Sequence, residues 1–141
     1  KTFEETLAAM PGTAQERLFA RAQLALPLMI VALGAFWIVS GVIGLAAIGD
    51  AARHLYGVVG VSAAKALVVV GSIADIAIGA GLYLRRTARP AALASVAVAG
   101  FYLFAGTLTA PSLWLDPFGA LAKIIPLLAM GLAVALMLEE R

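Results

Sequence analysis

Four long runs of hydrophobic residues follow one another along the chain, with short polar segments between them. Because an α-helix rises about 1.5 Å per residue, a run of about 20 residues crosses the ~30 Å hydrocarbon core of a bilayer. The pattern therefore predicts an all-α membrane protein, a four-transmembrane-helix bundle. Pro27 is expected in the first turn of its helix, whereas Pro126 is expected to kink an interior turn. The runs cover residues 24–48, 66–84, 91–110 and 117–138.

Polar residues are concentrated before the first run. Residues 1–23 are predicted to form a cytoplasmic connector with a short amphipathic helix, followed by the transmembrane domain at 24–141. Thr13 and Glu16 have the spacing of a capping box, which predicts that a helix begins there. This helix either lies on the membrane surface through its apolar face or extends the first span.

The composition supports a membrane domain and excludes several classes of site. The chain is 63% hydrophobic and 13% charged, with a mean hydropathy of +1.02. A net charge of +2 is too small to indicate a nucleic-acid partner. The hydrophobic runs make the lipid bilayer the expected partner. The absence of cysteine excludes thiolate chemistry and iron–sulfur ligation by this chain. With His54 as the single histidine, no metal site is expected.

Basic residues predict the orientation of the bundle. Under the positive-inside rule, the side with more Lys and Arg faces the cytoplasm. Both termini and the turn at 85–90 are therefore expected to be cytoplasmic. Seven basic residues fall on that side and three on the other: Lys1, Arg17, Arg21, Arg85, Arg86, Arg89 and Arg141 against Arg53, Lys65 and Lys123.

Asp75 is the strongest indication of a functional site, because it lies within the otherwise uncharged run at 66–84. A carboxylate at bilayer depth costs about 2.5–3.5 kcal/mol on insertion scales, so it normally has a partner or a function. Three interpretations remain open: a polar contact that locks helices together, a binding or proton-handling group, and a lipid-facing residue without a role.

Depth along the helices suggests a partner for this carboxylate. Counted from the cytoplasmic ends of their runs, Asp75 lies about 14 Å deep and Lys123 about 22 Å deep. A long lysine side chain can bend across this difference, so an Asp75–Lys123 ion pair is predicted. Tyr102, Ser40 and Trp37 are further hydrogen-bonding candidates, although packing alone also explains a tryptophan at this depth. These five residues are the predicted ligand-binding candidates, and no catalytic residue is assigned.

Each run also carries small and polar residues at helical spacing, which is typical of helix contacts inside membranes. In order along the chain, these stripes are Trp37, Ser40, Gly41 and Gly44; Gly71, Asp75 and Gly79; Ser95, Tyr102, Gly106 and Thr109; and Lys123, Pro126, Met130 and Gly131.

Several of these segments resemble the DoxX-like membrane domain. They are FWIVSG at 36–41, the segment 75–79, the stretch from Tyr102 through PSLWLDP at 111–117, and residues 123–126. The resemblance is strongest to the domain that follows a short-chain dehydrogenase/reductase-like, NAD(P)-binding half in certain bacterial fusion proteins. Residues 17–21 resemble the connector between those halves.

The resemblance implies a function in membrane redox chemistry. The chain is expected to be a membrane anchor or accessory module of an oxidoreductase system in the bacterial inner membrane, not catalytic alone. A quinone-like ligand is the implied cofactor, and NAD(P) would bind only in a partner or a missing domain. The implied partner is a cytoplasmic redox domain or a larger membrane complex. Two alternatives remain: a purely structural membrane subunit, and a small transporter or proton pathway.

Overall fold

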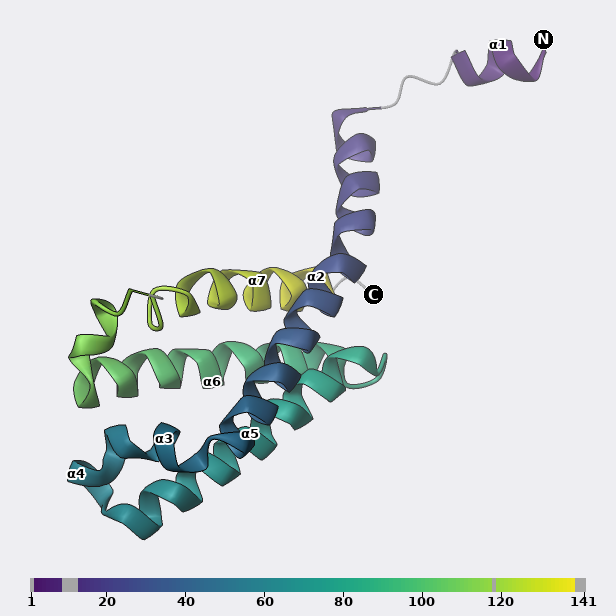
Figure 1. Cartoon of the computed structure of the whole chain (residues 1–141). Coiled ribbons are helices and arrows are strands. Elements are labelled where there is room, and N and C mark those ends of the chain that lie inside the picture. Colours follow the sequence, from purple (N-terminus) through teal and green to yellow (C-terminus); the bar gives the residue numbers. More distant parts are fainter. Residues whose placement is uncertain (1, 9–12, 118, 139–141) are drawn as a thin grey trace.

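A computed structural model describes residues 2–8, 13–117 and 119–138, and within these ranges the chain contains helices and no strand. Figure 1 shows their arrangement. The elements are α1 (Phe3–Ala8), α2 (Ala14–Ala46), α3 (Ile48–Ala52), η1 (Arg53–Leu55), α4 (Tyr56–Val59), α5 (Val61–Tyr83), α6 (Ala88–Thr109), η2 (Pro111–Trp114) and α7 (Ile124–Met137).

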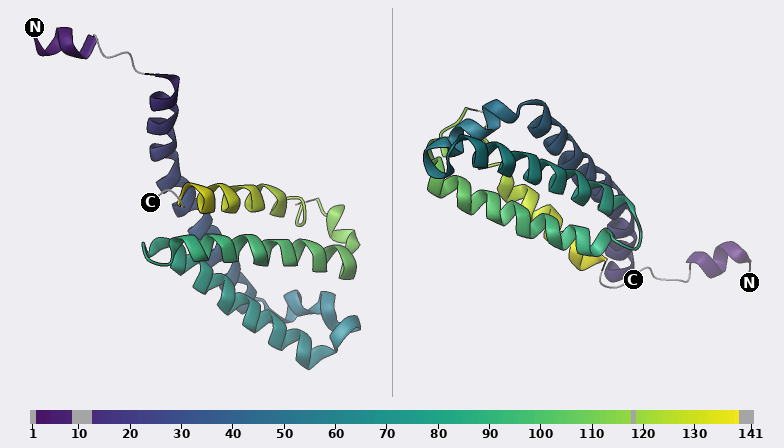
Figure 2. Two further views of the ribbon diagram at one scale, coloured as in Figure 1. Left: turned by 180° about the vertical axis from the view of Figure 1, so that it is seen from behind. Right: turned by 90° about the horizontal axis from the view of Figure 1, so that it is seen from below.

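The long helices form two pairs that open away from each other. α2 packs most extensively on α5, and α6 packs on α7, while α5 and α6 are joined by a tight turn. Towards its C-terminal end α7 approaches α2 again, so the two pairs meet at the end of the bundle that carries the α5–α6 turn (Figures 1 and 2). The pairs are separated at the opposite end, where α3, η1 and α4 follow α2.

The first helix is longer than a single span. α2 contains 33 residues and is about 50 Å long, so residues 14–23 are a helical extension of the first hydrophobic run. The predicted capping box is confirmed: the Thr13 hydroxyl accepts from the Glu16 amide at 3.2 Å, and the Glu16 carboxylate accepts from the Thr13 amide at 2.8 Å. The division predicted at residue 23 falls inside this helix.

The proline predictions are both wrong, because the helices begin at other residues than the hydrophobic runs suggest. Pro27 lies in the interior of α2, where it removes one backbone donor and crowds the preceding turn. The helix changes direction along its course, as expected for an interior proline (Figure 1). Pro126 instead lies in the first turn of α7, where a missing N–H is tolerated.

The fourth hydrophobic run forms a shorter helix than predicted. α2, α5 and α6 are long and apolar enough to cross a membrane, whereas α7 has 14 residues and a length of about 21 Å. The chain before α7 forms turns, and Leu121 within them is 4% exposed and packs beside Gly106. Non-helical backbone at membrane depth is tolerated where protein covers it, and this packing provides such cover. Three long spans are thus supported, and a fourth full-length helix is not.

Glycines allow α2 and α5 to approach closely. A methyl group added at Gly79 would lie 2.7 Å from the Gly34 carbonyl oxygen, and one at Gly41 would meet the Ser72 carbonyl. On the other pair, a methyl group at Gly131 would lie 2.8 Å from the Ser95 hydroxyl. The small-residue stripes predicted from the sequence therefore do form helix contacts.

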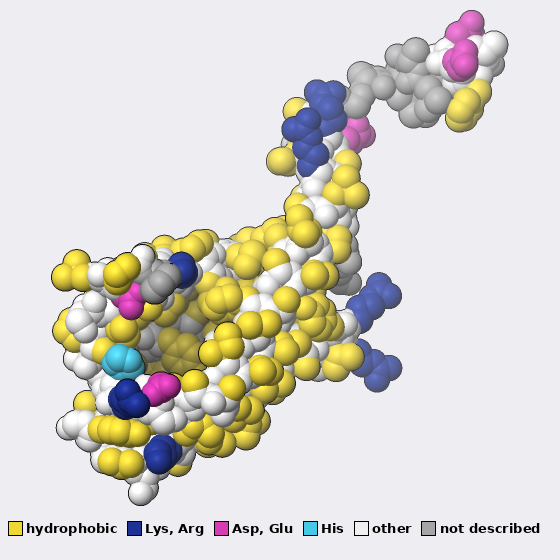
Figure 3. All heavy atoms as spheres, in the orientation of Figure 1, with side chains coloured by type: hydrophobic (Ala, Val, Ile, Leu, Met, Phe, Trp, Pro, Cys, Tyr) yellow, Lys and Arg dark blue, Asp and Glu magenta, His cyan; other side chains and the backbone are white. Residues whose placement is uncertain are grey.

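Large apolar side chains cover the outside of the helices. Leu28 is 71% exposed, Val70 65% and Phe104 65%, each on a different long helix. Hydrophobic side chains dominate the view of Figure 3, and charged ones gather at the ends of the molecule. A surface of this kind requires lipid around it, so the chain is an all-α membrane protein.

Candidate functional site

The carboxylate of Asp75 connects three helices. It lies on α5 and is 5% exposed. Its Oδ1 accepts a hydrogen bond from the Tyr102 hydroxyl of α6 at 2.9 Å, and its Oδ2 accepts one from the Ser40 hydroxyl of α2 at 3.3 Å. The polar centre, defined as Asp75, Tyr102 and Ser40, joins the α2–α5 pair to α6.

Neighbouring glycines make room for these side chains. Gly71 lies one turn before Asp75, and a Cβ there would be 3.1 Å from the Tyr102 hydroxyl oxygen. Gly41 follows Ser40, and a Cβ there would be 3.2 Å from the Asp75 Cβ. The glycine spacing in the sequence thus permits the hydroxyls to reach the carboxylate, because a larger residue would displace either partner.

Aromatic rings pack beside the polar centre. The ring centroids of Trp37 and Tyr102 are 6.4 Å apart, and Phe36 meets Trp37 edge to face at 5.9 Å. Trp37 is 1% exposed, and its buried Nε1–H has no hydrogen-bond partner among the residues that the structure describes. A buried donor without an acceptor costs free energy, so it is available to a ligand that brings one.

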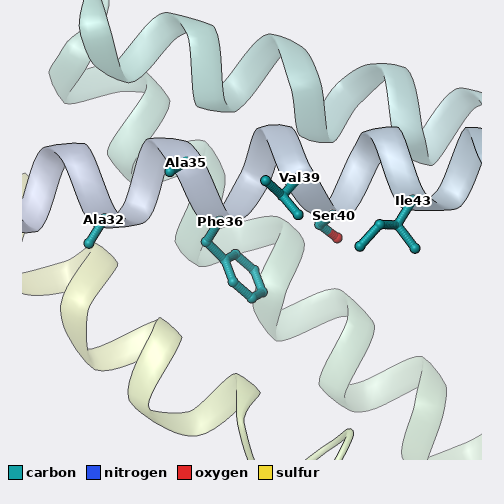
Figure 4. Close-up of a pocket in the computed structure, with 6 residues that line it drawn as sticks. All are labelled: Ala32, Ala35, Phe36, Val39, Ser40 and Ile43. Carbon is teal, nitrogen blue, oxygen red and sulfur yellow. The ribbon is translucent and has the colours of Figure 1, made fainter.

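A groove of about 490 Å³ runs along the α2 surface next to this centre. Its lining is apolar except for the Ser40 hydroxyl, which also binds Asp75. Figure 4 shows Ala32, Phe36, Ser40 and Ile43 directed to the side of α2 on which α6 and α7 lie. Figure 3 shows the molecule hollowed between α2 and α7, with mainly hydrophobic walls. The residues that line the groove are Ala32, Ala35, Phe36, Val39, Ser40 and Ile43.

The predicted Asp75–Lys123 ion pair does not form. Both Asp75 oxygens accept from hydroxyls, and within the described ranges the ion pair observed joins Arg53 to Asp50 at 2.9 Å. Lys123 is exposed and lies in the turn just before α7. The depth estimate assumed a helix from residue 117, and the chain is not helical there. Of the five candidates, the structure brings Asp75, Tyr102, Ser40 and Trp37 together and leaves Lys123 outside.

The sequence interpretation missed the groove, although its signal is present. The lining residues recur at intervals of three and four, which places them on one face of α2 next to the predicted polar stripe. An apolar face on a membrane helix normally contacts lipid, so the pattern alone does not distinguish a groove from a lipid-facing surface.

The chemistry available here is hydrogen bonding and proton handling in an apolar setting. The polar centre combines a carboxylate with two hydroxyls, and the unpartnered indole N–H belongs to Trp37, which packs beside it. Among the described residues, no group of three His, Cys, Asp or Glu side chains could hold a metal ion. The arrangement suits an apolar ligand with a hydrogen-bond acceptor at one end, because such sites have mostly apolar walls and few polar groups.

Comparison with known proteins identifies the family. The sequence pattern of the DoxX-like family matches residues 34–132, which include all five candidate residues. The chain belongs to the DoxX-like family. Neither a curated protein nor a solved structure matches it. The DoxX-like match begins inside α2 and ends inside α7, so the polar centre and every groove residue except Ala32 lie within the matched segment.

Proposed function

We propose that this DoxX-like chain is a membrane anchor or accessory module of an oxidoreductase system and binds a quinone-like ligand in the groove of α2. The observation that carries the proposal is the groove that shares Ser40 with the polar centre. The buried, unpartnered N–H belongs to Trp37, which lies behind the groove and packs against the lining residue Phe36. An apolar ligand dissolved in the bilayer would enter from the lipid side without crossing water.

The residues present fit a quinone carbonyl. Trp37 offers an N–H with no acceptor among the described residues, and the Ser40 hydroxyl, which donates its proton to Asp75, lines the groove. Asp75 orients the Ser40 and Tyr102 hydroxyls, and the carboxylate can hold a proton for the ligand oxygen. A bound quinone would supply two-electron, two-proton chemistry, which these side chains do not possess.

A partner would have to supply the electrons. The chain has no cysteine, and its described part has no group of three potential metal ligands. We propose that a redox domain on the cytoplasmic side, or a larger membrane complex, docks at the end that carries Arg85, Arg86 and Arg89. NAD(P) would bind in that partner or in a fused domain, as in the dehydrogenase fusions that the sequence resembles.

One observation favours a structural role as the second candidate. Both oxygens of Asp75 already accept hydrogen bonds from neighbouring helices, so the carboxylate is satisfied without a ligand. In that case the polar centre would only fix the positions of α2, α5 and α6.

Filling the groove distinguishes the two candidates. We expect Ala35→Phe to lower the amount of quinone that remains bound after purification by about tenfold. This factor corresponds to a loss of about 1.4 kcal/mol in binding free energy. Ala35 lines the groove, whereas Val42 is 53% exposed on the same helix outside the lining, so Val42→Phe is the matched control. Bound quinone is measured by solvent extraction and chromatography of protein reconstituted with a prenylated benzoquinone. Equal quinone retention by both variants would contradict the ligand site and support the structural role. The absence of bound quinone in the unmodified protein would do the same.

The orientation proposed from the basic residues is testable at two exposed positions. We propose that the α5–α6 turn faces the cytoplasm of a bacterial inner membrane, which places the start of α2 and the end of α7 on that side. In the cysteine-free chain, a Cys at Ser112 in η2 should react with an impermeant maleimide in intact cells, and a Cys at Thr87 should react only after lysis. The reverse labelling pattern would show that the α5–α6 turn faces away from the cytoplasm.

A further inference from the structure

A second groove lies at the end of the bundle where α5 turns into α6. Its volume is about 550 Å³, and helices α2, α5 and α6 contribute to it together with the residue that follows α7. The lining residues are Pro27, Ile30, Val31, Leu82, Tyr83, Arg85, Ala88, Arg89 and Leu138. This groove is separate from the one beside Asp75 and shares no residue with it.

Local structure maintains this groove. The Tyr83 hydroxyl donates to the Val31 carbonyl at 2.9 Å and ties the last turn of α5 to α2. Tyr83 also packs against Gly34, where a side chain would collide with the ring. Pro27 redirects α2 just before this contact, so the preceding part of α2 leaves the bundle (Figure 1).

The lining has two chemically different parts. Pro27, Ile30, Leu82 and Leu138 form apolar walls, while the exposed Arg85 and Arg89 add two positive charges. Arg86 carries the same charge in the same turn and is not part of the lining. Basic side chains project from this end of the molecule in Figure 3. A ligand complementary to both parts would have a negative head and an apolar tail.

The length of α5 places the groove at the expected depth of lipid head groups. α5 has 23 residues, which span about 34 Å, and Arg85 follows directly after its C-cap at Leu84. Guanidinium groups bind phosphate through paired hydrogen bonds, and anionic lipids attract basic residues at the membrane surface.

We propose that this groove is a binding site for an anionic phospholipid. Arg85 and Arg89 hold the phosphate, and the first part of an acyl chain lies along Pro27, Ile30 and Leu82. The site is independent of the proposed quinone site, so either can fail without the other.

Charge-matched variants test the site. Native mass spectrometry of protein released from nanodiscs of equimolar phosphatidylglycerol and phosphatidylcholine measures which lipid is retained. We expect Arg85→Ala and Arg89→Ala each to reduce retained phosphatidylglycerol by about tenfold, the loss of a charge-assisted phosphate contact. Arg86→Ala removes the same charge outside the groove, and at physiological salt it should change retention by about twofold or less. Unchanged melting temperatures confirm that the variants are folded.

Three results would overturn the proposal. An equal loss for Arg86→Ala would mean that the turn attracts anionic lipid only through its net charge. Displacement of the lipid by millimolar glycerol 3-phosphate would mean that the groove recognises a free phosphate rather than a lipid. Retention of phosphatidylcholine as strong as that of phosphatidylglycerol would contradict a role for the arginines.

Discussion

Gly79→Ala is expected to destabilise the bundle by about 1–3 kcal/mol, the usual cost of overpacking a close contact. The added methyl group would lie 2.7 Å from the Gly34 carbonyl oxygen and 2.9 Å from the Ile38 amide nitrogen. These are backbone atoms of α2 and cannot rotate away, so the two helices must separate. The free energy of unfolding, measured by denaturation in mixed micelles, should fall accordingly.

Gly100 provides the matched control within a long helix. A methyl group there meets nothing within 4 Å, so Gly100→Ala should leave the stability unchanged or raise it by up to ~1 kcal/mol through helix propensity. Similar losses in the two variants would show that the α2–α5 contact is not as close as described.

The second large effect concerns the partners of Asp75. Asp75→Leu leaves the half-buried Tyr102 and Ser40 hydroxyls without their acceptor, and an unsatisfied group costs up to about 1–3 kcal/mol when it is fully buried. Combining Asp75→Leu with Tyr102→Phe should therefore cost less than the sum of the single variants, with a coupling of about 0.5–3 kcal/mol. Double-mutant cycles of unfolding free energy measure this coupling.

Lys123→Met supplies the comparison for this cycle. Lys123 is exposed and makes no ion pair with Asp75, so its combination with Asp75→Leu should be additive. Strong coupling between positions 75 and 123, with none between 75 and 102, would restore the ion pair predicted from depth and contradict the observed hydrogen bonds.

The residues that could be predicted from the sequence are those with periodic signals. Hydrophobic runs predict the long helices α2, α5 and α6, and the glycine spacing predicts the close contacts at Gly41 and Gly79. The polar stripes also predict that Asp75, Tyr102 and Ser40 lie near one another, because polar side chains inside a membrane bundle form hydrogen bonds with each other, and the structure shows these contacts.

The remaining features depend on where helices begin, which hydrophobicity does not encode. Leu121 is apolar and buried, yet it lies in a turn, so the run at 117–138 overstated the length of α7. The predicted depth of Lys123 is wrong for the same reason, because it counts residues along a helix that begins only at Ile124. The groove along α2 lies on an apolar helix face, and its sequence pattern is the same as that of a face that contacts lipid.

The two tryptophans of the chain allow the most direct test of the ligand site. Trp37→Phe removes the unpartnered buried N–H while keeping an aromatic ring, and Trp114→Phe removes an N–H that already donates to Thr107 at 3.2 Å. The quantity measured is the prenylated benzoquinone retained per protein after purification from reconstituted membranes. A quinone site beside Asp75 predicts about tenfold less quinone with Trp37→Phe, the loss of one hydrogen bond of about 1.4 kcal/mol, and unchanged retention with Trp114→Phe. Equal retention by both folded variants would contradict the site.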